Sequence, residues 1–186
     1  FQSDTLAVYD QQMVDLGDKI FDKRKKFIKE YSPLLADRYK TISGNNEQVT
    51  VEYQSQLEKD NFSYLLKDRQ QKDLQYQYSS VGIHKDDLIM KLNGYPIKKF
   101  GSQGQQKSYL IALKFAQYDF MLNQKEEKPI LLLDDIFDKL DQERVGQLIS
   151  MIAADKMGQL FISDTDSERT ETVVKNNVDQ FKLIEL

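Results

Sequence analysis

The fold is decided by residues 129–141, Pro-Ile-Leu-Leu-Leu-Asp-Asp-Ile-Phe-Asp-Lys-Leu-Asp. Four consecutive apolar residues, 130–133, stand between a proline and two adjacent aspartates. A short apolar run without alternation favours a strand that is buried on both faces, as in a parallel sheet covered by helices. Open α/β sheets bind their ligands at the carboxyl ends of such strands, which is where Asp134 and Asp135 stand.

The two acids suit chemistry on a phosphate. Asp134 can hold Mg²⁺, a hard cation that prefers oxygen ligands and keeps several waters. Asp135 can orient or deprotonate the attacking water of a phosphoryl transfer. Hydrophobic residues followed by Asp form the pattern called Walker B, but any buried strand can end in acids, so this pattern alone decides nothing.

A second informative stretch runs from Phe100 to Lys107, Phe-Gly-Ser-Gln-Gly-Gln-Gln-Lys. Ser102 and Gln105 are spaced as a capping box ahead of a long apolar-periodic segment, so they predict a helix start. A serine hydroxyl and glycines there let a phosphate approach backbone N–H groups and the positive end of the helix dipole. A well-capped core helix without a ligand is the alternative.

Together the two stretches resemble the C-terminal lobe of an ATP-binding-cassette (ABC) ATPase head. Residues 102–106 match that superfamily's signature motif, residues 130–135 its Walker B, and Leu140-Asp141 its D-loop. Within the superfamily, the chain resembles the RecF family of bacterial DNA replication and repair proteins. The stretches Gly82-Ile83-His84-Lys85-Asp86-Asp87-Leu88 and Asn93-Gly94 add to this likeness.

The resemblance implies an α/β fold, with a parallel sheet covered by helices and an attached helical arm. It implies a lever-like helical arm over residues 1–80 and the ATPase lobe over residues 81–186. ATP and Mg²⁺ are the implied cofactors, with Asp134 holding the metal and Asp135 positioning the water. The implied nucleotide-binding residues lie on the signature motif, on the D-loop and after the next strand: Ser102, Gln103, Gly104, Gln105, Asp141 and Thr165.

In the family, such heads work as dimers in which the signature serine of one subunit completes the site of the other. The resemblance therefore implies an ATPase that binds DNA as an ATP-dependent homodimer in the recombinational repair of gaps and the SOS response. Aspartate at position 135, where many cassette ATPases have the longer glutamate, predicts slow turnover, and we expect a cytoplasmic protein. The implied partners are double-stranded DNA or single-strand/double-strand junctions, and RecR-like and RecO-like repair proteins. No membrane partner is implied.

One motif of the family is missing from the sequence. No Gly-x-x-x-x-Gly-Lys-Ser/Thr occurs, so no P-loop of this chain wraps the triphosphate. We expect the P-loop in an N-terminal half that precedes this chain, which begins with Phe1 rather than Met. On its own, the chain is expected to be inactive.

Two other functions stay open. The chain could be a head fragment of the structural-maintenance (SMC) or Rad50 type, although the predicted arm is short for a long coiled coil. It could also be an interaction module that binds no nucleotide, in which the acids are solvated strand ends. A receiver-type phospho-acceptor also pairs acids, but it leaves the capping-box stretch unexplained.

Bulk composition limits the partners and the chemistry. The 186 residues carry a net charge of -4, so no overall basic character indicates nucleic acid binding. The absence of cysteine excludes disulfides, thiol nucleophiles and Cys-based zinc sites. No apolar run reaches membrane-spanning length, and no secretory signal is present.

Apolar residues at steps of three and four predict a long N-terminal helix with a narrow packing stripe, ending near Pro33. The stripe is Leu6, Tyr9, Met13, Leu16, Ile20, Phe27, Tyr31 and Leu34. The same helix carries the dense basic cluster Lys19, Lys23, Arg24, Lys25, Lys26 and Lys29. This basic cluster is either a solvated helix face or a contact with DNA phosphates.

The remaining elements follow from periodicity, caps and turn residues. Helices are expected over 61–76, after Ser102, after Asp141 and over 167–176. Strands are expected over 48–57, 160–162 and 180–184, and residues 88–92 and 95–100 are expected to form a hairpin. His84, the single histidine, is expected in a turn before a strand rather than in a metal site. Ser163 or Thr165 is expected where many cassette ATPases place a histidine.

Overall fold

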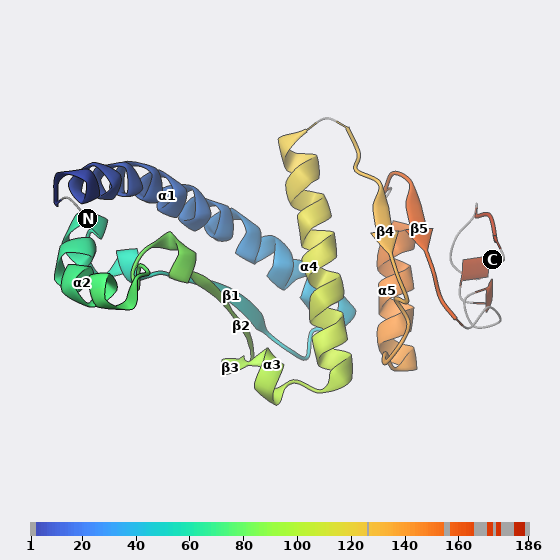
Figure 1. Ribbon diagram of the computed structural model, residues 1–186. Coiled ribbons are helices and arrows are strands. Elements are labelled where there is room, and N and C mark those ends of the chain that lie inside the picture. Colours follow the sequence, from blue (N-terminus) through green and yellow to red (C-terminus); the bar gives the residue numbers. More distant parts are fainter. Residues whose placement is uncertain are drawn as a thin grey trace. The chain divides into compact units, whose positions relative to one another are not determined.

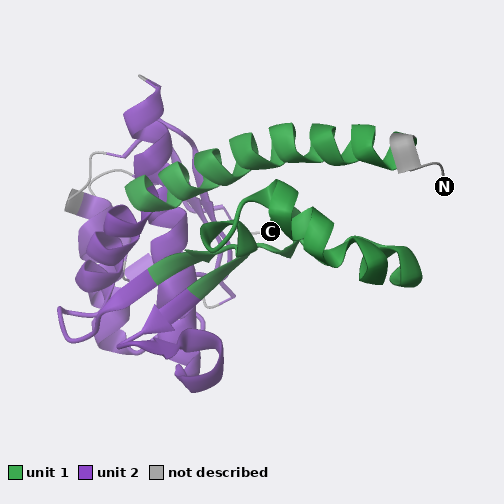
Figure 2. Ribbon diagram, turned by 90° about the vertical axis from the view of Figure 1, so that its left-hand side faces the viewer, with its two compact units in different colours: residues 1–30, 51–89 green, residues 31–50, 90–186 purple. Residues whose placement is uncertain are grey.

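The computed structural model describes residues 3–125, 127–154, 157–165, 171–172, 174–175 and 181–184. The chain divides into two compact units, each made of separate stretches (Figure 2). Unit 1 comprises residues 1–30 and 51–89, and unit 2 comprises residues 31–50 and 90–186. A functional division into an arm and a lobe at residue 80 stays a prediction.

Unit 1 is built from the N-terminal part of α1 (Ser3–Ile42) and from α2 (Phe62–Tyr76) (Figure 1). Asn61 caps α2 by accepting a hydrogen bond from the Tyr64 N–H at 2.7 Å. The small core is built from apolar side chains of α1, α2 and the connecting segments: Phe62, Leu66 and Val81, with Val14, Leu57 and Leu65 packed against them.

Gly17 of α1 makes this core possible, because the Phe62 ring lies directly against it. A Cβ atom at position 17 would lie 2.5 Å from the ring carbon Cε1 of Phe62. Gly82 meets the same ring, with a Cβ there 2.7 Å from Cζ. Phe62 is therefore held between two glycines that come from distant parts of the sequence.

The predicted packing stripe of α1 is wrong in register. Of its eight residues, Tyr31 is buried, whereas Tyr9 and Leu16 are 55% and 60% exposed. The observed stripe contains a glycine, which hydrophobic periodicity overlooks. It consists of Val14, Gly17, Phe21, Ile28, Tyr31, Leu35, Tyr39 and Ile42.

The prediction that α1 ends near Pro33 is also wrong, because α1 continues to Ile42. Pro33 removes one backbone N–H and crowds the preceding turn, which normally ends or kinks a helix. Here Leu35, Tyr39 and Ile42 are fully buried within about two and a half turns after the proline. Their burial stabilises the helix across the proline.

A three-stranded sheet has the order β1 (Val49–Gln54), β2 (Asp87–Leu92), β3 (Tyr95–Pro96). Asn93 and Gly94 have φ of 48° and 84°, as a type I′ turn requires, which confirms the predicted hairpin turn. The second arm is shorter than predicted, because residues 97–100 form the helical turn α3 (Ile97–Phe100). Pro96 cannot donate to a strand ladder, and Ile97 turns inward and is buried.

Short 3₁₀ turns complete the connections around β1 and β2. They are η1 (Gln56–Glu58) and η2 (Ile83–Lys85). His84 lies in η2, and β2 begins three residues after it, at Asp87, in agreement with the predicted turn before a strand.

Unit 2 holds α4 (Gln103–Gln124), β4 (Leu131–Leu133), α5 (Gln142–Ala154) and β5 (Leu160–Ile162) (Figure 1). The strands β4 and β5 pair in parallel, with Leu131 opposite Leu160 and Leu133 opposite Ile162. The end of α1 packs against α4, where the Tyr39 and Tyr109 rings lie 5.9 Å apart. The core of this unit combines these helices with α5 and the turn after β4.

One face of β4 is exposed, contrary to the predicted burial of both faces. Leu131 and Leu133 are buried, whereas Ile130 and Leu132 are 62% and 68% exposed. Successive side chains of a strand point to opposite sides, and the described residues cover one side of this strand. Packing among the described residues therefore accounts for the apolar character of Leu131 and Leu133, but not for that of Ile130 and Leu132.

The C-terminal predictions are tested in part. Residues 171–172 and 174–175 are helical, inside the helix predicted over 167–176, whose other residues lie outside the described ones. The predicted edge strand over 180–184 is wrong at residues 181–184, which have no regular structure. Phe181, Leu183 and Ile184 are all exposed, so their alternation buries no face here. Among the described helices, none is both long and apolar enough to cross a membrane.

Candidate functional site

The two predicted acids follow β4 directly and are tied to β5 by one hydroxyl group. The Asp135 N–H donates to Ser163 Oγ at 3.1 Å, and the Ser163 hydroxyl donates to Asp134 Oδ1. The parallel pairing places Ser163 there, since its N–H donates to the Leu133 carbonyl at 3.0 Å. Ser163 thus bridges both acids at the carboxyl ends of the strands.

The turn that contains Asp135 is held from a second side by α4. Asp135 has φ of 48°, in the left-handed region that costs a non-glycine residue about 1 kcal/mol or more. Lys107 Nζ donates to the Asp135 carbonyl at 2.8 Å. Ser163 and Lys107 together fix the backbone at the predicted catalytic position.

The start of α4 has the predicted capping box. Ser102 Oγ accepts a hydrogen bond from the Gln105 N–H at 3.2 Å, and Gln105 Oε1 accepts one from the Ser102 N–H at 2.8 Å. The amides of Gln103 and Gly104 precede the first intrahelical hydrogen bond and lie at the open helix end. This end therefore presents N–H groups and the positive dipole to an anion.

Gly104 also has a packing role within the chain. A Cβ atom at this position would lie 3.1 Å from the Lys139 carbonyl oxygen, closer than most real contacts. Lys139 is itself left-handed, with φ of 61°. The first turns of α4 thus lie against the segment 135–141 at two points, Gly104–Lys139 and Lys107–Asp135.

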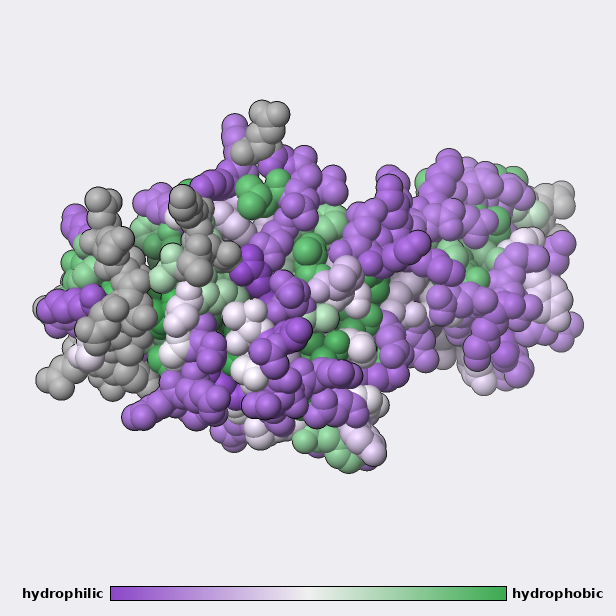
Figure 3. Space-filling view, turned by 180° about the vertical axis from the view of Figure 1, so that it is seen from behind, coloured by the Kyte–Doolittle hydropathy of each residue, from purple (hydrophilic) through white to green (hydrophobic). Residues whose placement is uncertain are grey.

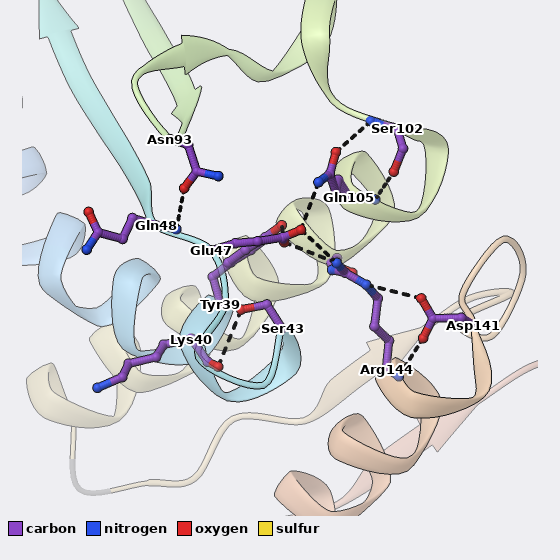
Figure 4. A network of polar contacts seen from close by, with 11 residues as sticks. Tyr39, Lys40, Ser43, Glu47, Gln48, Asn93, Ser102, Gln105, Asp141 and Arg144 are labelled. Carbon is purple, nitrogen blue, oxygen red and sulfur yellow. Dashed lines mark hydrogen bonds and ion pairs between the residues drawn. The ribbon is translucent and has the colours of Figure 1, made fainter.

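Asp141 caps α5, as predicted, by accepting a hydrogen bond from the Arg144 N–H at 2.8 Å. The Arg144 side chain returns to Asp141, with Nε 3.4 Å from Oδ2. Its guanidinium also donates to both oxygens of Glu47, at 3.0 and 3.1 Å. Figure 4 shows Arg144 lying between Asp141 and Glu47.

Glu47 links this ion pair to the start of α4. It lies in the loop between α1 and β1, and its carboxylate accepts hydrogen bonds from Gln105 Nε2 at 2.8 Å and from the Tyr39 hydroxyl at 2.6 Å (Figure 4). The side chains of Glu47 and Arg144 are 14% and 15% exposed. A nearly buried, fully hydrogen-bonded ion pair therefore joins three segments of unit 2.

The pKa values in this network reflect competing effects. Burial alone would raise the pKa of Glu47, but hydrogen bonds from Tyr39, Gln105 and Arg144 and the Arg144 charge outweigh it, so this pKa lies below its ordinary value. Burial alone would lower the pKa of Arg144, but its bonds to Tyr39 and Glu47 raise it. The pair is therefore charged throughout the neutral range.

The structure brings the predicted residues together in two groups. Ser102, Gln105 and Asp141 belong to the Glu47–Arg144 network, and Asp134 and Asp135 meet through Ser163. Gln103 and Thr165 are exposed, and the hydroxyl that contacts the acids is that of Ser163.

Sequence reasoning missed Lys107, Glu47 and Arg144. Arg144 stands three residues after Asp141, a spacing that brings side chains together on a helix. Glu47 gives no such signal, because its partners lie 8, 58 and 97 residues away in the sequence.

The acids fit a magnesium site that depends on a bound phosphate. The described residues contain no group of three or more His, Cys, Asp or Glu side chains that could hold a metal by themselves. Mg²⁺ is commonly held by one or two carboxylates together with substrate phosphates and waters. Asp134 is suited to be such a carboxylate.

Comparison with curated proteins gives close relatives. The chain is 48% identical over 186 residues to the DNA replication and repair protein RecF of Flavobacterium johnsoniae, covering 100% of this chain and 52% of that protein. The chain is a RecF homologue. The RecF of Phocaeicola vulgatus is 41% identical over 184 residues, 98% of this chain and 50% of the relative. The chain thus spans about half the length of the RecF proteins it matches.

Solved structures agree on the fold. The recombination mediator protein RecF-ATP of the RecFOR pathway superposes with a TM-score of 0.75 at 24% identity, over 90% of this chain and 47% of that chain. An SMC ATPase, from work on ATP-driven dimerisation and DNA-stimulated activation, gives a TM-score of 0.57 at 13% identity, over 89% and 82%. The chain thus shares its α/β fold with these RecF and SMC structures. A scan against protein-family models finds no match.

Proposed function

We propose that this chain supplies the signature motif, the acids and the D-loop of a RecF-like DNA repair ATPase. Its P-loop would lie outside these 186 residues. The observation that carries the proposal is the packing of the capped start of α4 against the turn that follows β4 and its two acids. An interaction module would not need this arrangement of an anion-binding helix end beside an acidic strand end.

In this proposal, each group has one role. Asp134 holds Mg²⁺, which neutralises charge on the phosphates when it is bound. Asp135 positions the attacking water. Ser102, with the amides of Gln103 and Gly104, meets the γ-phosphate carried by a second subunit, and Asp141 faces that subunit across the interface.

We further propose that ATP closes a homodimer on DNA during gap repair, with RecR-like and RecO-like proteins as partners. The support is the relatedness to RecF proteins and the likeness to RecF-ATP and SMC structures. The α1 basic cluster is the candidate DNA contact. Three of its members already face acids: Arg24 with Asp86, Lys25 with Glu58 and Lys26 with Glu30.

The other three members, Lys19, Lys23 and Lys29, are exposed. The face of the molecule drawn in Figure 3 is largely hydrophilic, with smaller apolar patches between the polar side chains. If these lysines contact phosphates, replacing all three by alanine should reduce the salt dependence of DNA binding by about 0.9 in log–log slope per lost contact.

The proposal is tested by calorimetry with ATP and Mg²⁺, on this chain and on the full-length protein. We expect binding to the full-length protein, none to the chain alone, and loss of the magnesium dependence in full-length Asp134→Asn. Tight binding of ATP by the isolated chain would show that the phosphate cradle has been assigned to the wrong part. Unchanged binding and dimerisation in an Asp134→Asn, Asp135→Asn double variant would favour an interaction module.

A further inference from the structure

We propose that Glu47 and Arg144 are positioning residues that make the start of α4 and the turn at Asp141 move together. The proposal rests on the proposed function, since it assigns a task to residues between the predicted signature motif and the predicted D-loop. Neither residue belongs to either motif. The evidence is a continuous path of hydrogen bonds from Ser102 to Asp141 (Figure 4).

The Glu47 carboxylate is saturated with donors, so it has a single orientation. Oε1 accepts from Gln105 Nε2 at 2.8 Å and from Arg144 Nη2 at 3.0 Å. Oε2 accepts from the Tyr39 hydroxyl at 2.6 Å and from Arg144 Nη2 at 3.1 Å. Charge-assisted hydrogen bonds of this kind are about twice as strong as neutral ones.

Gln105 passes this restraint to Ser102. Its side-chain amide is held at both ends, because Oε1 accepts from the Ser102 N–H while Nε2 donates to Glu47. The amide therefore cannot rotate without losing one of the two bonds. A neutral side chain at position 47 would weaken the hold on Gln105 and free the capping residue to change conformation.

Arg144 passes the same restraint to Asp141. Its Nη1 donates to the hydroxyl of Ser108, a fully buried residue of α4, at 3.0 Å. Its Nε and its backbone N–H both face the Asp141 carboxylate. One guanidinium thus connects α4, the loop after α1 and the turn before α5.

The low exposure of Glu47 and Arg144 makes it costly to break the hydrogen bonds that connect Ser102 with Asp141. Separating two charges that are about 85% shielded from water is costly, because little solvent replaces the lost partner. A displacement of Ser102 by a phosphate of the second subunit is therefore followed by Asp141. Such coupling between two positions typically corresponds to about a 5- to 150-fold change in affinity.

The chain offers a matched control in the same helix. Arg38 and Asp119 form a two-bond pair at 2.6 and 2.5 Å, with both side chains 15% exposed. Asp119 lies 17 residues after Ser102, about 25 Å along α4. Asp119→Asn removes an ion pair of the same burial without interrupting the path from Ser102 to Asp141.

Amide hydrogen exchange on the chain itself tests the coupling without any nucleotide. In Glu47→Gln, we expect exchange to rise about tenfold at residues 105–108 and at 144–146 together, since both lose protection when the path opens. In Asp119→Asn, these amides should keep their protection. Exchange that rises at one end only, or equally in both variants, would overturn the proposal.

ATP-dependent dimerisation of the full-length protein tests the functional role. We expect Glu47→Gln to weaken the dimer about tenfold while ATP binding to the monomer stays the same, with Asp119→Asn dimerising normally. Arg144→Lys should act like Glu47→Gln, because a lysine cannot reach Ser108, Glu47 and Asp141 at once. A wild type that fails to dimerise would contradict the proposed function; a wild type and Glu47→Gln that dimerise equally would contradict this inference alone.

Discussion

Each compact unit contains one carboxylate whose side chain is largely shielded from water, and the two differ in how completely they are hydrogen-bonded. Glu47 of unit 2 and Asp86 of unit 1 each pair with an arginine far along the chain, and each accepts a hydrogen bond from a tyrosine hydroxyl. Both oxygens of Glu47 have donors. In Asp86, Oδ2 takes the bonds from Arg24 and Tyr53, while the buried Oδ1 has no partner in the described part of the chain.

The arginines differ as well. The Arg24 side chain is 46% exposed, whereas the Arg144 side chain is 15% exposed. Arg24 can turn to water if its partner is lost, but Arg144 would stay largely buried with only its longer contact to Asp141. The difference indicates that the polar network organises unit 2, whereas unit 1 depends more on the Phe62 contact with its two glycines.

The largest effect is expected from Glu47→Leu. This change leaves the largely buried Arg144 with only the longer contact to Asp141, and breaking a buried pair costs about 3–5 kcal/mol. Denaturant unfolding of the chain, followed on a signal from unit 2, measures the loss. A loss below about 1 kcal/mol would show that water reaches Arg144, since exposed pairs contribute that little.

A smaller loss is expected from Gly17→Ala in unit 1. The added methyl group would lie 2.5 Å from the Phe62 ring, and overpacking of this kind costs about 1–3 kcal/mol. The matched control is Gly146→Ala in α5, where no described atom beyond the adjoining residues and the backbone of α5 itself lies within 4 Å of the new Cβ. There we expect a gain of about 0.5–1 kcal/mol from helix propensity. Equal effects at the two glycines would contradict the close contact with Phe62.

Asp86→Asn should cost less than Glu47→Leu, about 1 kcal/mol. The asparagine oxygen can still accept from Tyr53, its NH2 group replaces an oxygen that has no partner among the described residues, and Arg24 remains half in water. The same unfolding experiment gives the comparison. If this variant loses more than Glu47→Leu, our ranking of the two ion pairs is wrong.

The smallest expected effect concerns acid pH. Because the pKa of Glu47 is lower in the folded state than its ordinary value of 4.5, the stability it contributes is complete above that value and is lost as the pH falls through the folded-state pKa. Between about pH 5 and 3, stability should therefore fall less steeply in Glu47→Gln than in the wild type. Parallel pH profiles of the two proteins would contradict this contribution.

Local signals predicted most of unit 2. The capping box of Ser102 and Gln105, the cap at Asp141 and the apolar run before Asp134 all depend on neighbours within a few residues. Such patterns can be recognised in a single sequence because a helix cap involves residues a few positions apart and a strand is marked by its own apolar run.

The remaining features depend on contacts between distant segments. Apolar periodicity cannot place the stripe of α1, because the contact at Gly17 depends on the small size of glycine, which a search for apolar residues does not detect. Pro33 predicts a helix end, but the burial of Leu35 and Tyr39 stabilises the helix beyond it. Glu47 was missed because a single acid in a loop carries no periodicity and gains its importance from Arg144, 97 residues later.

In the proposed function, Ser102 acts on nucleotide that is held by a second subunit. Light scattering with ATP and Mg²⁺ on the full-length protein tests it, with Ser102→Asn as the variant, because asparagine keeps the helix cap but replaces the hydroxyl. Asn61→Ala, which removes the cap of α2, controls for capping alone. We predict an ATP-dependent dimer for the wild type and for Asn61→Ala, and a monomer that still binds ATP for Ser102→Asn. An ATP-dependent dimer of Ser102→Asn with undiminished affinity would contradict the claim.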